Sequence, residues 1–478
     1  SITSKEIIHN KIKRQINYKN AWLKIYNIPV MYFPKFFHPG PTVKRQSGLL
    51  VPHINNSNIL GTSLQLPYFH VISDNKDLTF QTSVFEDGKI MFQNEYRQVN
   101  KNSSFIGDFA YVNGYQSESS NNKNSISHFF SKYNLDLNLE KFNISTLKIF
   151  LEKVSQDTYL KVFERNLIDT TILPNSQGTM NTGMNIILDT ENHKFSSGFD
   201  IYENLGVQKN SDRFAYSLPY YNYSKSPTLL KYGQINFTSS GSNNLDNTNN
   251  LKTSISNNID YENYDLISKR GIKNNFNLYF KNLNIVAKND QVYRSSPQFK
   301  LSNLIEASTS LPLYKIDDYN TNYIIPKLSL RFNPTHMSNK ATSNRNIDID
   351  NIFSIDRLGL GSTYEEGQSL TLGIDYKKES IQDLNKYFEL KLGTVFRDTR
   401  EDKIPSSSTI NRRGSNIFGS ITNSFSNFYK LDYDFSIDND LNTIEYNSIK
   451  STFYLPNITS EFLFTERNGT LGDTNFIS

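Results

Sequence analysis

The chain has 478 residues, no cysteine and a formal net charge of +4, with 51 Lys and Arg against 47 Asp and Glu. The absence of cysteine excludes disulfides, thiolate nucleophiles and cysteine-based metal sites within these residues. The small net charge gives no support for a nucleic-acid partner. Hydrophobic residues make up only 37%, but aromatic residues reach 13%, a combination typical of a transmembrane β-barrel and also found in soluble β-proteins.

Residues 1–20 alternate Ile with Lys and Arg, a pattern that predicts the last strands of an upstream sheet. The following stretch, 21–54, is rich in proline, which fixes φ and removes a ladder N–H, so it favours exposed backbone over a central strand. We interpret it as a junction between two β domains. Its two adjacent basic residues suit either an anionic headgroup or phosphate, or a solvated turn. The candidate junction residues are Pro29, Pro34, His38, Pro39, Pro41, Lys44 and Arg45.

From Leu49 onward, polar and apolar residues alternate with the period of a β-strand. Asp87-Gly88 supplies the positive φ of a tight hairpin, with 90–99 as the returning strand. Each alternating segment is close to the ~10 residues with which a tilted strand crosses a membrane. Further segments are expected at 64–68, 78–84, 133–139, 251–261, 276–280, 370–376 and 429–437.

The predicted connections alternate between tight turns and long stretches rich in Asn and Ser, expected at 117–125, 239–248 and 338–346. An outer-membrane barrel has this asymmetry, because its periplasmic turns are short and its outer loops are long. At roughly 22 residues per strand with its connection, we expect 18 to 20 strands, too many for one sandwich. No strict repeat of 20–50 residues appears, which argues against a solenoid or a propeller.

The sequence contains no local catalytic motif. It has no G-x-S-x-G elbow, H-E-x-x-H helix or P-loop, and its seven histidines are scattered without metal-ligand spacing. We therefore predict no enzyme, no cofactor and no metal site.

Several motifs occur in a specific order along the chain. They are A-x-L-x-I-x-x-I-P-V-x-Y-x-P-x-F-x-H-P-x-P-x-V-K-R-x-S-G-x-L at Ala21 to Leu50, Leu66-Pro67-Tyr68-Phe69, Asp77, Glu95-Tyr96-Arg97, Asp157-Thr158-Tyr159-Leu160, and Ile347 to Tyr376. Together these motifs resemble the LptD family of lipopolysaccharide-assembly proteins, also called OstA or organic solvent tolerance proteins. Two departures occur in the last motif, where Thr363 replaces the second Arg and Leu372 replaces an aromatic residue.

This resemblance implies an all-β protein, in which the end of a periplasmic β-jelly roll precedes a large antiparallel transmembrane β-barrel of roughly 26 strands. Residues 1–45 are then the remnant of the jelly roll with its junction, and residues 46–478 are an outer-membrane barrel that lacks its C-terminal strands and cannot close on its own. The implied partners are lipopolysaccharide, a periplasmic bridge protein, a small lipoprotein plug and membrane lipids. Disulfides between the two domains, known in the family, would need cysteines outside these residues.

The family also implies a route for the substrate. Acyl chains must avoid water while the saccharide must avoid hydrocarbon, so the two parts separate at a lateral gate between the first and last strands. Pro52 and Pro67 fall on the family's gate prolines in the first two barrel strands, with a bulge or a strand end as the alternative explanation. The alternative functions are a solute channel or ligand-gated receptor barrel, and a soluble β adhesin or surface-layer protein, which would need a polar outward face.

Overall fold

The computed structural model describes residues 2–11, 15–25, 28–40, 45–115, 124–207, 210–469 and 473–478. Strands dominate these residues, and the helices among them are short: α1 (Tyr159–Phe163), α2 (Asn210–Arg213) and the 3-10 helices η1 (Glu164–Asn166) and η2 (Ser406–Ser408). No helix in this part of the chain is long and apolar enough to cross a membrane. The predicted all-β class is confirmed.

The N-terminal strands form a separate antiparallel sheet in the order β1-β2-β3. Its strands are β1 (Ile2–Asn10), β2 (Gln15–Ile25) and β3 (Ile28–Pro39). Strand β3 is therefore an edge strand, the position where a sheet tolerates proline. This sheet ends before Gly48, where the next sheet begins.

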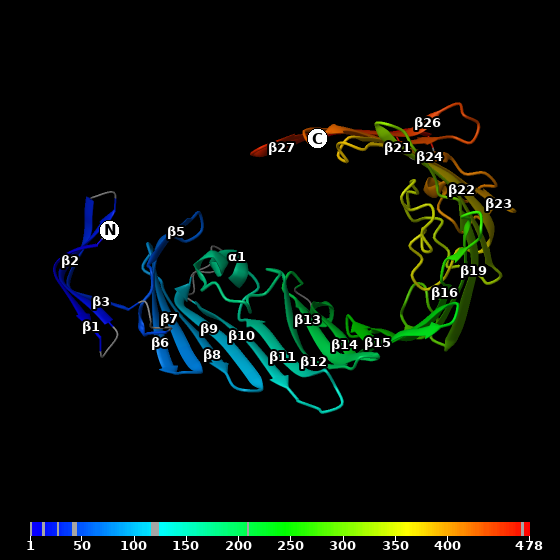
Figure 1. Ribbon diagram of the computed structural model, residues 1–478. Helices are drawn as coiled ribbons and strands as arrows, with labels where there is room; N and C mark the ends of the chain where they lie inside the picture. The colour runs from blue at the N-terminus through cyan, green and yellow to red at the C-terminus, as the bar shows by residue number, and fades with distance from the viewer. Residues whose placement is uncertain are drawn as a thin grey trace. The chain divides into compact units, whose positions relative to one another are not determined.

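Strands β4 to β28 follow chain order in one large antiparallel sheet of 25 strands, more than the 18 to 20 expected (Figure 1). The chain divides into two compact units, and strands β13 to β16 contribute residues to both. The strands from β4 to β16 are β4 (Gly48–Leu49), β5 (His53–Ser57), β6 (Gly61–Ser73), β7 (Lys76–Phe85), β8 (Ile90–Val99), β9 (Ser103–Tyr115), β10 (Asn124–Asp136), β11 (Ile144–Val154), β12 (Thr179–Asp189), β13 (His193–Asn204), β14 (Phe214–Leu230), β15 (Gly233–Asp246) and β16 (Asn250–Asn263).

The second unit contains all the strands that follow β16. They are β17 (Leu266–Ile267), β18 (Lys273–Lys288), β19 (Gln298–Ser310), β20 (Leu313–Ile316), β21 (Asn320–Asn333), β22 (Gly367–Ser380), β23 (Tyr387–Arg397), β24 (Ile417–Ser426), β25 (Tyr429–Ile437), β26 (Ile444–Leu455), β27 (Ile458–Arg467) and β28 (Thr474–Ile477).

The two faces of the first strands have the reverse of the polarity expected in water. Large apolar side chains on β6 to β10 are exposed, whereas polar side chains on the opposite face are buried. A water-soluble sheet buries its apolar face, while a membrane strand turns that face to lipid. The exposed set includes Leu64, Phe80, Phe92, Phe109 and Phe129, and the buried set includes Gln65, Gln81, Gln93, Asp108 and His128.

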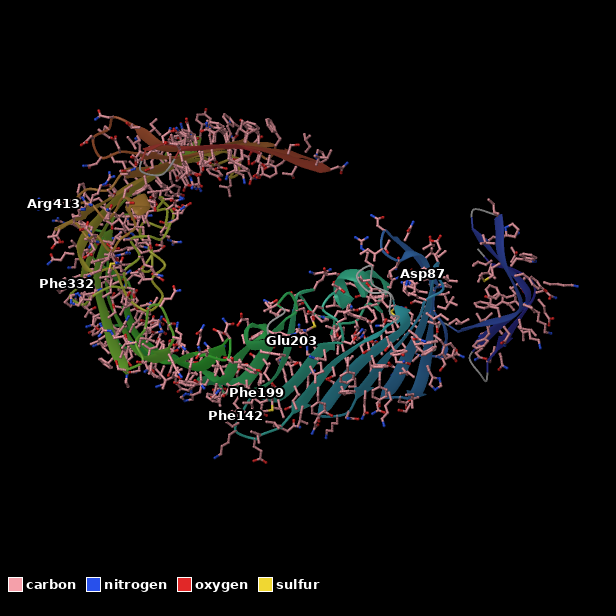
Figure 2. All side chains as sticks on the ribbon, turned by 180° about the vertical axis from the view of Figure 1, so that it is seen from behind. Asp87, Phe142, Phe199, Glu203, Phe332 and Arg413 are labelled. Carbon is pink, nitrogen blue, oxygen red and sulfur yellow. The ribbon has the colours of Figure 1, made fainter. Side chains whose placement is uncertain are left out.

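The same reversal occurs in the second unit. Phe332 is exposed and points away from the loop that follows β21 (Figure 2), whereas its neighbours Arg331 and Asn333 are buried. On the adjacent strand β22, Leu372 and Ile374 are exposed, while Ser369 and Thr371 are buried. The polar outward face that a soluble adhesin requires is absent from these strands.

The connections at the two ends of the strands differ in length, as predicted. Short turns such as 74–75 and 100–102 lie at one end, and long connections such as 155–178, 334–366 and 398–416 lie at the other. The expected loop at 338–346 is confirmed, and 117–125 lies mostly outside the described residues.

The loop expected at 239–248 is wrong, because its residues lie mostly in β15. Their amide and hydroxyl groups bond across to neighbouring strands: Ser217 Oγ donates to Asn244 at 2.9 Å, and Ser239 Oγ donates to Asn257 at 2.8 Å. Partners of this kind let an Asn- and Ser-rich segment form a strand.

Candidate functional site

Pro67 lies in β6 on its buried, polar face. The backbone N–H of Leu50 donates to the carbonyl oxygen of Pro67 at 2.9 Å. In an antiparallel ladder the N–H and C=O of one residue face the same neighbouring strand. The N–H that proline lacks is therefore the group that would have bonded back to Leu50, and this pair keeps only one of its two ladder bonds.

Pro52 lies between β4 and β5, not within a strand as expected. The pairing with β6 changes from Leu49↔Tyr68 to His53↔Gln65. The advance of four residues from Leu49 to His53 thus matches an advance of only three residues along β6, from Tyr68 to Gln65. This mismatch of one residue is the geometry of a β-bulge. The first edge of the large sheet consists of two short segments with Pro52 in the interruption.

Four of the predicted junction residues lie in a strand. Pro29, Pro34, His38 and Pro39 lie in β3 and continue the three-stranded sheet, where Pro29 pairs with Lys24 at an irregularity of the register. Proline is allowed there because β3 is an edge strand of the sheet that the described residues form. Pro41 and Lys44 lie outside the described residues.

Arg45, the last predicted junction residue, is fixed to the first strands of the large sheet. It forms an ion pair with Asp77 of β7, and Arg97 Nε of β8 donates to the other oxygen of Asp77 at 2.7 Å. Both guanidinium groups lie near the ring of Phe69, at 5.9 and 6.0 Å from its centroid. Glu95 lies 3.5 Å from Arg97. Motif residues that are separate in the sequence thus meet in one cluster.

The connection between β11 and β12, residues 155–178, returns onto the buried face of the first strands, and we call it the strap (Figure 1). Asn55 of β5 donates to the carbonyl oxygen of Arg165 at 2.6 Å. Asn166 donates to Ser63 Oγ at 2.7 Å and accepts a bond from Gln81 at 2.9 Å. The strap therefore bonds directly to β5, β6 and β7.

A buried polar chain continues from the strap to β10. The backbone N–H of Ile168 donates to Gln93, which donates to both oxygens of Asp108 at 3.0 and 2.9 Å. His128 Nε2 lies 3.2 Å from Asp108, and His128 Nδ1 lies 2.8 Å from the hydroxyl of Tyr159. Through the contact between Tyr159 and His128, this set of hydrogen bonds fixes α1 to β10.

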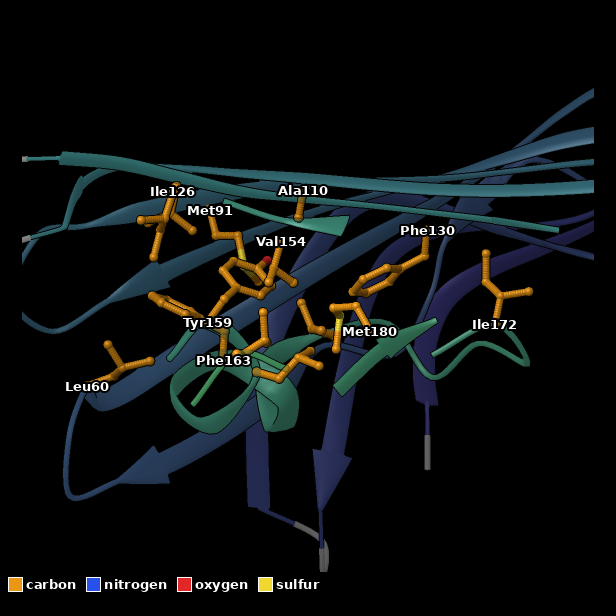
Figure 3. Close-up of a cluster of buried hydrophobic side chains, with 14 of the residues drawn as sticks. Leu60, Met91, Ala110, Ile126, Phe130, Val154, Tyr159, Phe163, Ile172 and Met180 are labelled. Carbon is orange, nitrogen blue, oxygen red and sulfur yellow. The ribbon is translucent and has the colours of Figure 1, made fainter. Parts of the chain in front are cut away.

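The apolar side of α1 packs against the same strands (Figure 3). Phe163 is fully buried, with ring centroids 5.9 Å from Phe85 and 5.4 Å from Tyr159. The sequence motif at 157–160 marked this place, but no signal in it predicted a helix. The buried cluster consists of Leu60, Phe85, Met91, Ala110, Val112, Ile126, Phe130, Val154, Tyr159, Leu160, Phe163, Leu167, Ile172, Met180 and Leu205.

In the second unit, the loop 334–366 is fixed to the sheet by Arg357, one of the largest fully buried side chains. Its guanidinium donates to both oxygens of Glu365, at 2.7 and 2.8 Å, in a bidentate pair. It also donates to Ser369 at 3.0 Å and to Thr371 at 2.9 Å on β22. A single side chain thus holds both the loop and the strand.

Two more arginines complete this network. Arg397 of β23 pairs with Glu365, while Arg331 of β21 donates to Glu306 at 3.0 Å and to the carbonyl oxygen of Ser354 at 2.9 Å. All of these charged side chains are buried. No group of three or more His, Cys, Asp and Glu side chains suited to a metal ion occurs among the residues that the structure describes.

The Glu365 carboxylate predicts a pH dependence. Burial raises its pKa, but Arg357 and then Arg397 lower it by more, so that the pKa falls from 4.5 to about 2. A lowered pKa stabilises the fold above pH 4.5, and this contribution of about 3 kcal/mol is lost as the pH falls toward 2. We expect the free energy of unfolding, measured in micelles with urea, to fall over this range. Glu365→Gln should flatten the dependence, and an unchanged profile in that variant would contradict the assignment.

Residues 16–224 match the family model described as LptD protein. This segment, somewhat less than half of the chain, is similar to the LptD family.

Proteins named LPS-assembly protein LptD are similar to parts of the chain. That of Yersinia pestis bv. Antiqua is 33% identical over 99 residues, 21% of this chain and 13% of that protein. That of Francisella tularensis subsp. novicida is 36% identical over 92 residues, which are 19% of this chain and 10% of that protein. That of Idiomarina loihiensis is 24% identical over 156 residues, which are 32% of this chain and 20% of that protein. The matched segments thus span at most a fifth of these relatives.

The LptD match contains Arg45, Pro52, Pro67 and the strap, so the family and the geometry of the first strands coincide. The network around Arg357 lies beyond residue 224. The LptD-like pattern at 347–376, which contains Arg357 and Glu365, remains a resemblance of sequence.

Proposed function

We propose that this chain is part of an outer-membrane translocon that receives lipopolysaccharide from a periplasmic bridge protein and inserts it into the outer leaflet. Its route is a lateral gate between the first and last strands of the barrel, and a small lipoprotein plug completes the assembly. It is a transport protein, with no catalytic step. The interrupted first edge of the sheet, at Pro52 and Pro67, is the observation that carries the proposal.

The two faces of the sheet match the two parts of an amphiphile. The exposed apolar residues of β6 to β10 suit acyl chains and lipid, and the buried polar residues suit a saccharide. A substrate that moves from the polar to the apolar face has to pass an edge of the sheet. A solute channel has no such requirement, because its substrate stays on the polar face.

The first edge has few ladder bonds to oppose that passage. Strands β4 and β5 contain only two and five residues. They are separated by the bulge at Pro52, and Pro67 lacks the N–H that would bond back to Leu50, the residue after β4. Each missing bond lowers the stability of the ladder by about 1 kcal/mol. The segment that contains β4 and β5 is therefore suited to separate from β6.

Replacing the prolines tests this gate. Pro67→Val restores an N–H opposite Leu50, and Pro52→Val removes the constraint in the interruption, so we expect the export rate to fall about fivefold, as a barrier about 1 kcal/mol higher implies. The measurement is the arrival of labelled lipopolysaccharide at the surface of cells that depend on the full-length protein. Pro326→Val in β21 is the matched control, since Pro326 also accepts a backbone bond within the large sheet. Unchanged export in the double variant, or equal slowing in the control, would count against the gate.

Photo-crosslinking separates the translocon from a solute channel. Lipopolysaccharide should crosslink to photoreactive residues placed at Pro52 and Pro67 when it is delivered through the bridge. Crosslinks confined to polar-face positions away from this edge would favour the channel.

A further inference from the structure

We propose that Arg45 and Arg97 form a binding site for a phosphate group at the entrance to the first strands. The proposal rests on the proposed function, because it names a group of the substrate that this region would contact. The chemistry of the site is bidentate recognition of phosphate by two oriented guanidinium groups.

The cations project while their carboxylate partner is enclosed. The side chains of Arg45 and Arg97 are 35% and 44% exposed, whereas that of Asp77 is only 8% exposed. Each guanidinium takes one oxygen of Asp77, so this carboxylate orients both cations from below. The arrangement leaves positive charge toward the open side of the cluster.

The two arginines retain unused donors. An arginine has five N–H donors in a planar fork. Arg97 uses Nε toward Asp77 and Glu95, and its terminal nitrogens have no acceptor among the described residues. Arg45 uses one nitrogen for the carbonyl oxygen of Asp74, at 2.8 Å, and one for Asp77. A phosphate oxygen would therefore find N–H groups that are already held in place.

Asp77 and Glu95 balance the two cations in number, but both carboxylates are buried and engaged with arginine. The ring of Phe69 lies below both guanidinium groups and limits their rotation. An ion pair needed only for stability would not require two partly exposed cations on one enclosed carboxylate.

The cluster of Arg45, Asp77 and Arg97 lies where a substrate would enter from the periplasmic end of the strands. Phe69 pairs with Thr79 and Asp77 pairs with Arg97, which places these side chains on the same polar face as Pro67. The cluster lies beside the short turn 74–75, the end of the strands expected to face the periplasm. A charged headgroup that follows the polar face would meet the arginines before it reached Pro67.

Crosslinking from Phe69 tests the proposal in the full-length protein in micelles. With photoreactive phenylalanine at this position, we expect lipopolysaccharide to crosslink. We also expect the yield to fall about tenfold in the Arg45→Gln/Arg97→Gln variant, and by a similar factor when the parent receives dephosphorylated lipopolysaccharide. Combining the two changes should cause no further loss. Arg400→Gln, an exposed arginine paired with Asp402, is the matched control and should leave the yield unchanged.

Further arms of the experiment distinguish the outcomes. Arg97→Lys keeps the charge and should lose part of the yield, because lysine cannot bind bidentately. If phosphatidylglycerol competes fully in the parent and not in the double variant, the site binds phosphate but takes it from phospholipid headgroups. A yield that does not depend on phosphate overturns the site, while crosslinks at Pro52 and Pro67 would preserve the proposed function. Loss of lipopolysaccharide crosslinks at all three positions would overturn both.

Discussion

Glu365→Ala is expected to lower the free energy of unfolding of the full-length protein in micelles by about 3–5 kcal/mol. The carboxylate balances Arg357 and Arg397, and the side chains of all three residues are less than 10% exposed. Without it, two guanidinium groups remain buried beside each other with no countercharge between them. Water cannot compensate them without opening the contact between loop 334–366 and β22 and β23.

The measurement is urea unfolding at neutral pH, monitored by the loss of β-sheet signal. Asp402→Ala is the matched control, because it removes a carboxylate from an ion pair whose partners are 70% and 84% exposed, and its effect should remain within about 0.5 kcal/mol. Glu365→Gln should lie between the two, since it keeps hydrogen bonds but not charge. A loss of less than 1 kcal/mol for Glu365→Ala would show that the network does not hold the loop.

The alternation of residues was sufficient to predict most long strands. The segments at 64–68 and 78–84 lie within β6 and β7, and Asp87-Gly88 forms the expected turn, with Gly88 at φ 82°. The number of strands was underestimated, because segments as short as β4 and β17 contain too few residues for a period to be recognised. Strand β15 was missed because its polar side chains resemble a loop until their partners on neighbouring strands are known.

Helix α1 could not be predicted for a different reason. It has five residues and no side-chain cap, so it is far below the length at which an isolated helix is stable. Its stability comes from Phe163 and Tyr159 on a sheet whose register a single sequence does not reveal. Proline content alone could not separate a connector from an edge strand such as β3, where Pro29, Pro34 and Pro39 lie.

The clusters of charge show the same limit. Arg45, Asp77 and Arg97 were all part of recognised motifs, yet their contact depends on the register between β7 and β8. Arg357 and Glu365 are close in sequence, but Arg397 joins them only through the pairing of β22 with β23. A useful signal is a charged residue at an inward position of an alternating strand, because such a charge needs a partner on a neighbouring strand or on a returning loop.

The strap has a testable role in holding the first strands. Phe163→Ala should lower the free energy of unfolding by about 3–5 kcal/mol, because the ring is fully buried between Phe85 and Tyr159 and its removal leaves a cavity. Lys161→Ala, an exposed residue of the same helix, is the matched control and should change stability by less than about 0.5 kcal/mol.

The location of the effect distinguishes a local anchor from general destabilisation. Since the strap bonds to β5, β6 and β7 through Asn55, Ser63 and Gln81, hydrogen exchange of these strands should accelerate in Phe163→Ala. Exchange in β21 to β23, which belong to the second compact unit, should remain as in the parent. Faster exchange throughout both units, or unchanged exchange in β5 despite the lost stability, would mean that the strap is a passive covering and that the first edge depends on its own ladder bonds alone.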